Sequence, residues 1–217
     1  MKIRYTNNVF IDTAHSLMNE YKDDTSNTLL IIGAINDCAR YDYAEYTKGF
    51  DKVIIFNQDP YDCILVNHLR EPYFDWIRRA DEVWDYEETN IQYLAGIGIQ
   101  AKLHILKPYK NWNMYGPVEK DIDFLFIGSL YDRRKVVLDF LKEKYNVVVT
   151  PDQTYGEALD DYILRSKVLL NIHGTTHFQE QARMVKWLGA PCQIISERSI
   201  HNYLNVPEMD YWELFCL

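Results

Sequence analysis

The sequence lacks the features of several common protein classes. Its cysteines form no C-x-x-C pair and have no histidine nearby at metal-binding spacing, so neither a zinc site nor a disulfide scaffold is indicated. No apolar run approaches the roughly 20 residues of a membrane span, and the first residues contain no apolar stretch typical of a secretion signal. We therefore expect a cytoplasmic protein without a membrane span, in the host cytoplasm if the chain is virus-encoded. Four reduced core thiols are expected: Cys38, Cys63, Cys192 and Cys216.

An excess of positive charge is missing as well. The 217 residues contain 23 Lys and Arg against 32 Asp and Glu, which gives a formal net charge of -9. This balance argues against a surface that binds polyanions generally, so any contact with nucleic acid has to be focused on a local basic cleft. The hydrophobic content of 47% is ordinary for a globular protein and allows a real core.

Short apolar runs alternate with helical patterns along the chain. Because these runs are continuous in apolar residues, they favour parallel strands that are buried on both faces of a sheet. Patterns of helical period lie between them, so the predicted fold class is α/β. The predicted strands cover residues 29–32, 53–56, 82–84, 103–106, 124–127, 147–149, 168–172 and 193–195.

The predicted strands divide into two sets of four around the segment 108–117. This segment is rich in turn formers and aromatic residues and has no helical or strand periodicity, so we interpret it as an interdomain linker. The predicted domains are residues 1–117 and 118–217. Each is a small Rossmann-like domain, and ligands are expected outside the carboxyl ends of the strands, in a cleft between the two domains.

A first candidate site follows the strand 124–127. Gly128 and Ser129 end this strand, and three cations, Arg133, Arg134 and Lys135, then crowd the first turn of a predicted helix. Positive charge is unfavourable at a helix N-terminus unless an anion binds there. Glycine permits close backbone approach, and arginine forks match phosphate oxygens, so the segment predicts a phosphate site. The alternative is a helix capped by its own aspartate, with its cations solvated.

A second candidate site combines a strand end with the start of the next helix. His173 and Gly174 follow the strand 168–172, and Glu180 and Arg183 begin a helix predicted over 181–188. Polar groups thus converge at the sheet edge where α/β folds bind ligands. The alternatives are a structural histidine and an i, i+3 surface pair of the glutamate and the arginine.

Two aspartates in the first half are candidates for a general base. Asp37 and Asp59 each lie just beyond a predicted strand, where a carboxylate can accept a proton from an incoming hydroxyl. Alternatively, each is a turn or cap carboxylate. The loop at Gly33 does not match the G-x-G-x-x-G fingerprint, so a nicotinamide cofactor is not supported.

Several stretches resemble, in order and spacing, the donor-binding half of GT-B glycosyltransferases. They are residues 121–135, 155–161, 168–173 and 180–191, followed by Ser196 and Glu197. The first half agrees more loosely, through the loop 57–60 and the segment 80–91. The resemblance implies two Rossmann-like domains that face each other across a cleft and bind a nucleotide-sugar.

The resemblance also implies a chemistry. The enzyme would transfer a sugar from the nucleotide-sugar to a hydroxyl acceptor, with no metal and no other cofactor. The diphosphate would be held by Gly128, Ser129 and Arg133 or Arg134, which would stabilise its charge as it leaves. Candidates for contacts with the nucleotide and sugar are His173, Gly174, Glu180, Arg183 and Glu197, with Asp37, Asp59 and His173 as candidate catalytic residues.

One departure from the pattern bears on activity. Many retaining GT-B enzymes carry two glutamates spaced as E-x-x-x-x-x-x-x-E, and the corresponding positions here are Phe178 and Lys186. Sugar recognition must then differ, with Glu180 or Glu197 as substitutes in a shifted geometry. The alternative function is a non-catalytic GT-B-like protein that binds a nucleotide or sugar, or acts as a scaffold.

The acceptor and the oligomeric state stay open. A glycan, a small molecule or a hydroxymethylated DNA base would each supply a hydroxyl, and some virus-encoded enzymes of similar architecture modify DNA. A DNA acceptor predicts a focused basic groove in the first half. Its candidate cations are Lys2, Arg4, Lys48, Lys52, Lys102, Lys107 and Lys110. A third hypothesis is a different phosphate-binding α/β enzyme, such as a nucleotide-dependent epimerase.

Overall fold

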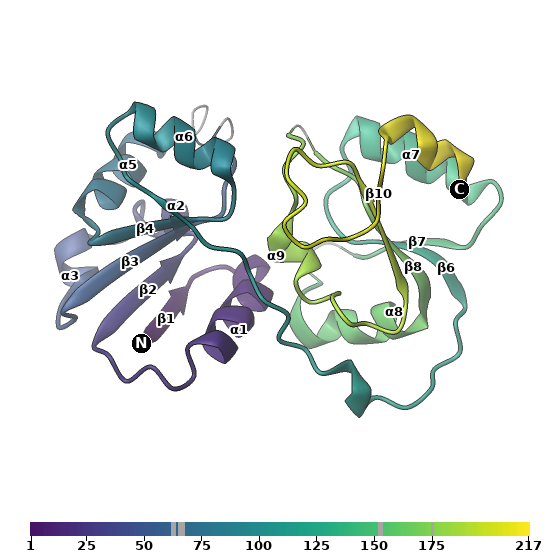
Figure 1. The fold of residues 1–217 in the computed structure, drawn as a ribbon, viewed down its shortest axis with the longest axis horizontal. Coiled ribbons are helices and arrows are strands. Elements are labelled where there is room, and N and C mark those ends of the chain that lie inside the picture. Colours follow the sequence, from purple (N-terminus) through teal and green to yellow (C-terminus); the bar gives the residue numbers. More distant parts are fainter. Residues whose placement is uncertain (62–63, 65–67, 152–153, 175) are drawn as a thin grey trace. The chain divides into compact units, whose positions relative to one another are not determined.

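The computed structural model describes residues 1–61, 64, 68–151, 154–174 and 176–217. The chain forms two compact units, residues 1–107 and 108–217, and each contains a five-stranded parallel sheet with helices (Figure 1). The predicted α/β class is therefore confirmed. Within the described residues, no helix has the length and apolarity needed to cross a membrane.

The first unit has its strands in the order β1-β2-β3-β4-β5, and all neighbours are parallel. The strands are β1 (Lys2–Tyr5), β2 (Thr28–Ile32), β3 (Lys52–Asn57), β4 (Glu82–Asp85) and β5 (Lys102–Leu103). The helices are η1 (Asn8–Phe10), α1 (Ile11–Glu20), α2 (Ala34–Asp37), α3 (Tyr43–Thr47), α5 (Arg70–Arg79) and α6 (Glu88–Gly96). Because the strand order follows the sequence order, the chain adds each strand on the same side of the previous one, and this sheet has no topological switch point.

Alternate side chains of these strands face two different layers. Ile55 and Val83 pack in a core cluster with residues of α5 and α6. Trp84 points to the opposite face, where it stacks on His104 with ring centroids 4.5 Å apart and lies 5.7 Å from the ring of Tyr21. Figure 1 shows α1 on one side of the sheet and α5 and α6 on the other. The sheet is thus buried on both faces, as its continuous apolar strands predict.

The second unit has the strand order β10-β9-β8-β6-β7, again with parallel neighbours. The strands are β6 (Ile122–Phe126), β7 (Val147–Val149), β8 (Ser166–Asn171), β9 (Gln193–Glu197) and β10 (Glu208–Met209). The helices are η2 (Trp112–Met114), α7 (Asp132–Lys142), η3 (Gly156–Leu159), α8 (Asp160–Arg165), α9 (Gln181–Met184) and η4 (Tyr211–Cys216). The chain leaves β6 for β7 on one side and then crosses to β8 on the other, which makes a topological switch point between β6 and β8.

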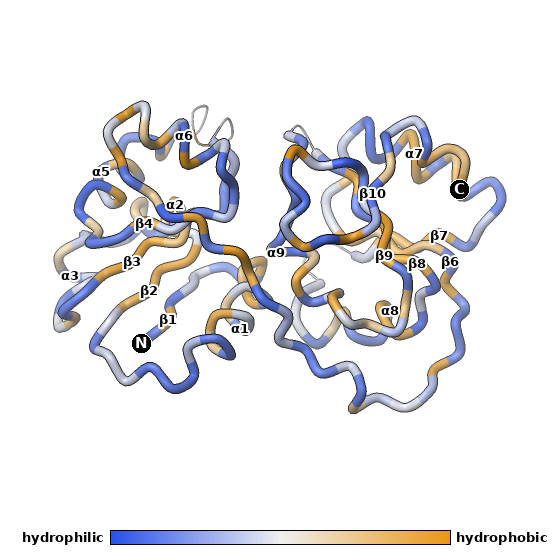
Figure 2. Tube along the Cα trace, in the orientation of Figure 1, coloured by the Kyte–Doolittle hydropathy of each residue, from blue (hydrophilic) through white to orange (hydrophobic). Residues whose placement is uncertain are grey.

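The sheet of the second unit also separates two apolar layers. On one face, Phe126 and Leu170 pack against Val137 of α7 and Leu214 of η4. On the other face, the core cluster is formed with α8 and with the segment around Met184. Figure 2 shows hydrophobic residues along β6, β8 and β9, whereas the connecting loops are mostly hydrophilic. The strands of this unit therefore carry the core, and their carboxyl ends lead into polar loops.

The segment 108–117 belongs to the second unit. The indole of Trp112 donates a hydrogen bond to the carbonyl oxygen of Lys186 at 2.9 Å, and the hydroxyl of Tyr115 donates to Asp160 at 2.7 Å. The unit boundary therefore falls after Lys107, earlier than the predicted position at 117. The aromatic residues that suggested a linker pack on the second unit instead.

Three local predictions differ from the structure. The helix predicted over 181–188 is α9 followed by turns, because the amide of Trp187 bonds to the carbonyl of Met184 three residues earlier and leaves the α-helical pattern. The strand predicted over 103–106 is limited to β5. Cys216 is exposed on η4 rather than in the core, whereas Cys38 and Cys192 are partly buried free thiols and Cys63 lies outside the described residues.

Candidate functional site

The candidate site lies at the carboxyl edge of the second sheet. Strands β6 and β8 end side by side, and the loops that follow them carry residues 128–129 and 173–174. In α/β sheets, ligands bind at this edge where the strand order reverses. The structure brings together nine predicted residues at this switch point: Gly128, Ser129, Arg133, Arg134, His173, Gly174, Glu180, Arg183 and Glu197.

Arg133 and Glu197 form a two-pronged ion pair. The Nη1 and Nη2 atoms of Arg133 donate to the two carboxylate oxygens of Glu197 at 2.8 and 2.5 Å. The backbone amide of His173 donates to the same carboxylate at 2.9 Å. Burial by itself raises the pKa of Glu197, but the hydrogen bonds from Arg133 and His173 outweigh it and the net shift is downward. Glu197 is therefore ionised at neutral pH, and Arg133 is held by the protein itself.

Arg134 and Arg183 share a single carboxylate, that of Glu180. Arg134 donates to Glu180 Oε1 at 2.6 Å, and Arg183 donates to the other oxygen, Oε2. The remaining donors of Arg134 bond to the carbonyl oxygens of Ile172 at 2.8 Å and Ser129 at 2.9 Å. Arg134 thereby ties the loop after β6 to the end of β8.

These two guanidinium groups are desolvated and close to each other. Both lie over the ring of Phe126, at 5.4 Å for Arg134 and 5.5 Å for Arg183. Burial lowers the pKa of Arg134 to about 10, and burial together with the charge of Arg134 lowers the pKa of Arg183 well below its usual range. Two cations that share one carboxylate leave a residual positive charge, which favours an additional anion at this edge.

Glycine is required in the loop after β6. Gly128 has a φ of +137°, in the range that favours glycine, and a Cβ atom there would lie 3.3 Å from Cζ of Arg183. The backbone of this loop therefore lies directly against the guanidinium group. A Cβ atom on Gly174 would lie 3.5 Å from Nη2 of Arg134, so the second loop approaches the other arginine.

The start of α7 also carries several positive charges, those of Arg133, Arg134 and Lys135. Its N-cap is Tyr131, whose side chain makes no capping hydrogen bond, and Asp132 is the first helical residue rather than the cap. Lys135 pairs with Asp139 one turn along the exposed surface. The helix start combines uncapped amide groups with cations, but each cation has a carboxylate partner within the protein, so the crowding of charge does not by itself require an external anion.

His173 is a neutral hydrogen-bond donor in this structure. Its Nε2 atom lies 3.0 Å from the carbonyl oxygen of Glu197, which can only accept, so Nε2 carries the proton. The side chain is fully buried, and burial lowers its pKa to about 4. An imidazole with this pKa is a weak base at neutral pH, which favours a structural role over proton abstraction.

The two positions at which the GT-B resemblance predicts paired glutamates are both buried in the second unit. Phe178 is 3% exposed and belongs to the interior, and Lys186 is 1% exposed. The ammonium group of Lys186 forms an ion pair with Asp160 at 2.8 Å. Lys110 bonds to the same aspartate at 2.5 Å, so Lys186 belongs to an internal charge network.

The two candidate bases, Asp37 and Asp59, belong to the first unit. Asp37 is fully buried at the end of α2 and accepts a hydrogen bond from the hydroxyl of Tyr46 at 3.0 Å, and burial raises its pKa. Asp59 follows β3, and burial raises its pKa to about 6. Of the two, Asp59 is the better matched to proton transfer near neutral pH.

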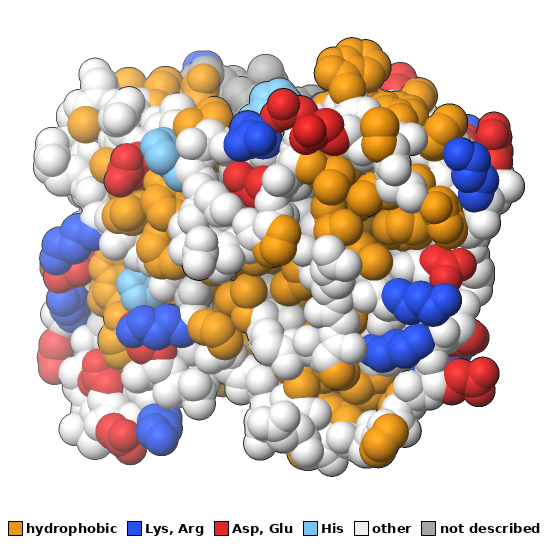
Figure 3. Space-filling model, turned by 45° about the vertical axis from the view of Figure 1, so that its right-hand side comes forward, with side chains coloured by type: hydrophobic (Ala, Val, Ile, Leu, Met, Phe, Trp, Pro, Cys, Tyr) orange, Lys and Arg blue, Asp and Glu red, His pale blue; other side chains and the backbone are white. Residues whose placement is uncertain are grey.

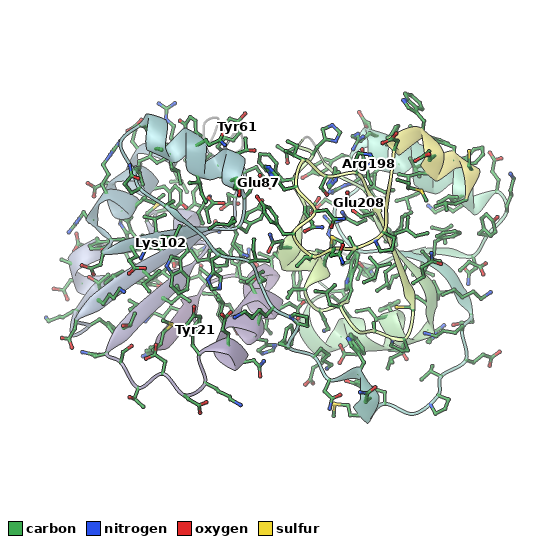
Figure 4. All side chains as sticks on the ribbon, in the orientation of Figure 1. Tyr21, Tyr61, Glu87, Lys102, Arg198 and Glu208 are labelled. Carbon is green, nitrogen blue, oxygen red and sulfur yellow. The ribbon has the colours of Figure 1, made fainter. Side chains whose placement is uncertain are left out.

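A buried polar network beside Asp59 was not predicted from the sequence. Asp85, at the end of β4, accepts hydrogen bonds from Asn57 at 2.6 Å and Asn90 at 3.2 Å, and burial raises its pKa to about 7. Figure 4 shows Tyr61 and Glu87 near α6, and Glu87 is the N-cap of this helix. The signal in the sequence was an acidic residue at the end of an apolar strand. That this residue, Asp85, lies beside Asn57 is shown by the pairing of β3 with β4.

Several contacts that residues 208–211 make within the second unit were not predicted from the sequence either. Tyr211 packs its ring on the guanidinium group of Arg133 at 4.4 Å and donates from its hydroxyl to the Arg133 carbonyl at 2.9 Å. Arg198 pairs with Asp210 at 2.6 Å, and the carboxylate of Glu208 accepts a hydrogen bond from the backbone amide of Ser199 at 3.1 Å; Arg198 and Glu208 are labelled in Figure 4. A separation of 78 residues hides the Tyr211 contact from the sequence.

The cations predicted to form a DNA-binding groove are largely paired with carboxylates. Lys52 and Lys102 both bond to Glu82, at 2.6 and 2.9 Å, and Lys107 bonds to Glu20. Lys48 and Lys110 also have carboxylate partners, and Lys110 lies in the second unit. On the face in Figure 3, blue cationic side chains are interspersed with red acidic ones. These ion pairs offset the positive charge that the predicted DNA-binding groove requires.

Comparisons with known proteins give relatives but no activity. No family model matches the chain. It is 28% identical over 219 residues to the uncharacterized protein L140 of Acanthamoeba polyphaga mimivirus, which covers 91% of this chain and 71% of that protein. It is also similar to the uncharacterized proteins L137 (26% identity) and L138 (33% identity) of the same virus. These matches cover 76% and 77% of this chain, which spans only 23% and 19% of those longer proteins.

Among the described residues, no cluster of three or more His, Cys, Asp or Glu side chains could hold a metal ion. The polar groups of the candidate site are instead guanidinium groups, backbone amides and two carboxylates. Their chemistry suits an oxygen-rich anion better than a cation. Donors of these kinds bind phosphate oxygens in other proteins.

Proposed function

We propose that the chain is a glycosyltransferase whose second unit binds the diphosphate of a nucleotide-sugar at the β6–β8 switch point. The observation that carries this proposal is the charge balance of the site, where the buried Arg134 and Arg183 share only Glu180. The residual positive charge, the glycine at 128 and the uncapped start of α7 are the features that a bound phosphate would use.

In the proposed reaction, the bond between the anomeric carbon and the diphosphate oxygen breaks as the acceptor oxygen bonds to that carbon. The departing diphosphate gains negative charge, and Arg134 and Arg183 lower the energy of that charge in a desolvated setting. The acceptor hydroxyl gives its proton to a base. Asp37, Asp59 and His173 stay the candidates predicted from the sequence for this base, and the pKa of Asp59, about 6, is closer to neutrality than that of His173.

The alternative is a non-catalytic protein that binds a nucleotide or a sugar. The residue types at these two positions favour it, because neither Phe178 nor Lys186 supplies the carboxylate that many retaining GT-B enzymes carry there. The two functions differ in turnover rather than in donor binding. Release of free nucleoside diphosphate in the presence of hydroxyl acceptors distinguishes them.

The test is thermal stabilisation by a panel of nucleotide-sugars and free nucleotides, since a ligand that binds only the folded state raises the melting temperature. We expect a selective shift with one nucleotide, and loss of that shift in Arg183→Ala. Lys135→Ala is the matched control, because it removes a cation that is paired on the exposed side of α7. A flat panel for the wild type, or an equal loss in both variants, would contradict the proposed donor site.

A further inference from the structure

Glu180 is more accessible to solvent than Arg134 and Arg183, the two arginines that it pairs with. Its side chain is 31% exposed, against 4% for Arg134 and 12% for Arg183. The carboxylate therefore covers the two guanidinium groups on their solvent side. An anion that approaches these arginines from solution meets Glu180 first.

The carboxylate of Glu180 bridges the two guanidinium groups. Each of its oxygens accepts from a different arginine, which is how two oxygens of a phosphate bind a pair of guanidinium groups. Among the described residues its bonds are to these two arginines, whereas Glu197 is also held by a backbone amide of the sheet edge. Glu180 can therefore leave by exchanging its arginine contacts for those of another anion.

We infer that Glu180 is a resident anion that partly compensates the charge of Arg134 and Arg183 in the ligand-free protein and is displaced by the phosphate of the ligand. This inference rests on the proposed function, because it assigns the regulation of the same site. The carboxylate offsets part of the charge of the two buried cations while no ligand is bound. It also makes the site selective for highly charged ligands, since a multiply charged diphosphate competes with a carboxylate better than a monoanion does.

Competition has a clear signature in the affinity of a Glu180→Gln variant for inorganic pyrophosphate. If Glu180 competes with the anion, its removal strengthens pyrophosphate binding on the order of tenfold, because a charge-assisted contact no longer has to be broken. The same variant should melt at a lower temperature than the wild type without ligand and regain stability with pyrophosphate. Glu143→Gln, at an exposed position at the end of α7, removes the same charge from the same unit as a control.

A second variant covers the case in which Glu180→Gln does not fold. Glu180→Asp keeps the charge but shortens the side chain, which loosens its hold on both arginines, and we expect pyrophosphate affinity between wild type and the glutamine variant. Weaker binding in either Glu180 variant would overturn the inference, since Glu180 would then support the ligand. Equal affinity in wild type, Glu180 variants and Glu143→Gln would overturn it as well.

Failure of the proposed function gives a different result. If neither the wild type nor the Glu180 variants bind pyrophosphate or any nucleotide, the phosphate site itself is wrong, and the inference is overturned with it. If the wild type binds pyrophosphate and Glu180→Gln binds it no more tightly, the phosphate site stands and only the role of Glu180 is rejected.

Discussion

Arg133 at the start of α7 and the buried Glu197 at the end of β9 form a two-pronged ion pair, with contacts of 2.8 and 2.5 Å. The pair joins the helix to the sheet edge beside the switch point. Because Glu197 also receives the amide of His173, the pair fixes the backbone from which the second loop starts. It is therefore a structural support of the site, and its partners are not free to hold a ligand.

Removal of this pair should lower the stability of the protein. We expect Glu197→Gln to reduce the free energy of unfolding by about 2 kcal/mol, because the variant loses the charge-assisted hydrogen bonds that the buried carboxylate accepts from Arg133 and the His173 amide. Urea denaturation measures the change. Asp210→Asn, which breaks the exposed pair with Arg198, is the control and should change stability little. Equal effects of the two variants would refute the structural role of the pair.

His173 should make stability depend on pH. Burial lowers its pKa from 6.5 to about 4 in the folded protein, so between these pH values the unfolded chain gains a proton that the folded chain does not. This contribution is present above pH 6.5 and is lost as the pH falls toward 4. It amounts to roughly 3 kcal/mol, at about 1.4 kcal/mol for each pKa unit.

The His173 prediction is checked by urea unfolding at pH 7 and pH 4.5. The His173→Gln variant retains an N–H group toward the carbonyl of Glu197 but no longer titrates, so it should lose less stability than the wild type between the two pH values. An identical loss in the two proteins would show that other groups dominate.

A side chain at position 128 should lower the stability of the protein. We expect Gly128→Ala to cost about 1–3 kcal/mol, because the φ of +137° disfavours other residues and the new Cβ presses on Arg183. Gly116→Ala is the matched control, since nothing lies within 4 Å of its Cβ position. Melting temperatures compare the two. Similar small changes in both variants would contradict the close packing of the loop on the arginine.

The sequence predicted the two loops of the site better than it predicted their chemistry. Apolar strands followed by glycine and polar residues identified the carboxyl ends of β6 and β8. The cations were also recognised, but Glu197 lies 64 residues from Arg133 and Glu180 lies 46 from Arg134, so their neutralisation was not visible. Local pattern shows which residues a strand end presents, and only the sheet order shows which of them meet.

The same limit explains the errors in the fold. Strand β1 was missed because Lys2 and Arg4 interrupt its apolar pattern at the edge of the sheet. The boundary was placed too late because the contacts of Trp112 and Tyr115 with the second unit depend on residues far along the chain. Central strands, which are buried on both faces, were found because their composition alone reports their environment.

The most direct test of the central claim is calorimetric titration of the wild type and Arg183→Ala with the nucleoside diphosphate that gives the largest thermal shift, with Lys135→Ala as the control. The account predicts binding by the wild type and Lys135→Ala and a loss of affinity of at least about tenfold in Arg183→Ala, as expected for a charge-assisted contact. Unchanged affinity in a folded Arg183→Ala variant would contradict a phosphate site at the β6–β8 switch point.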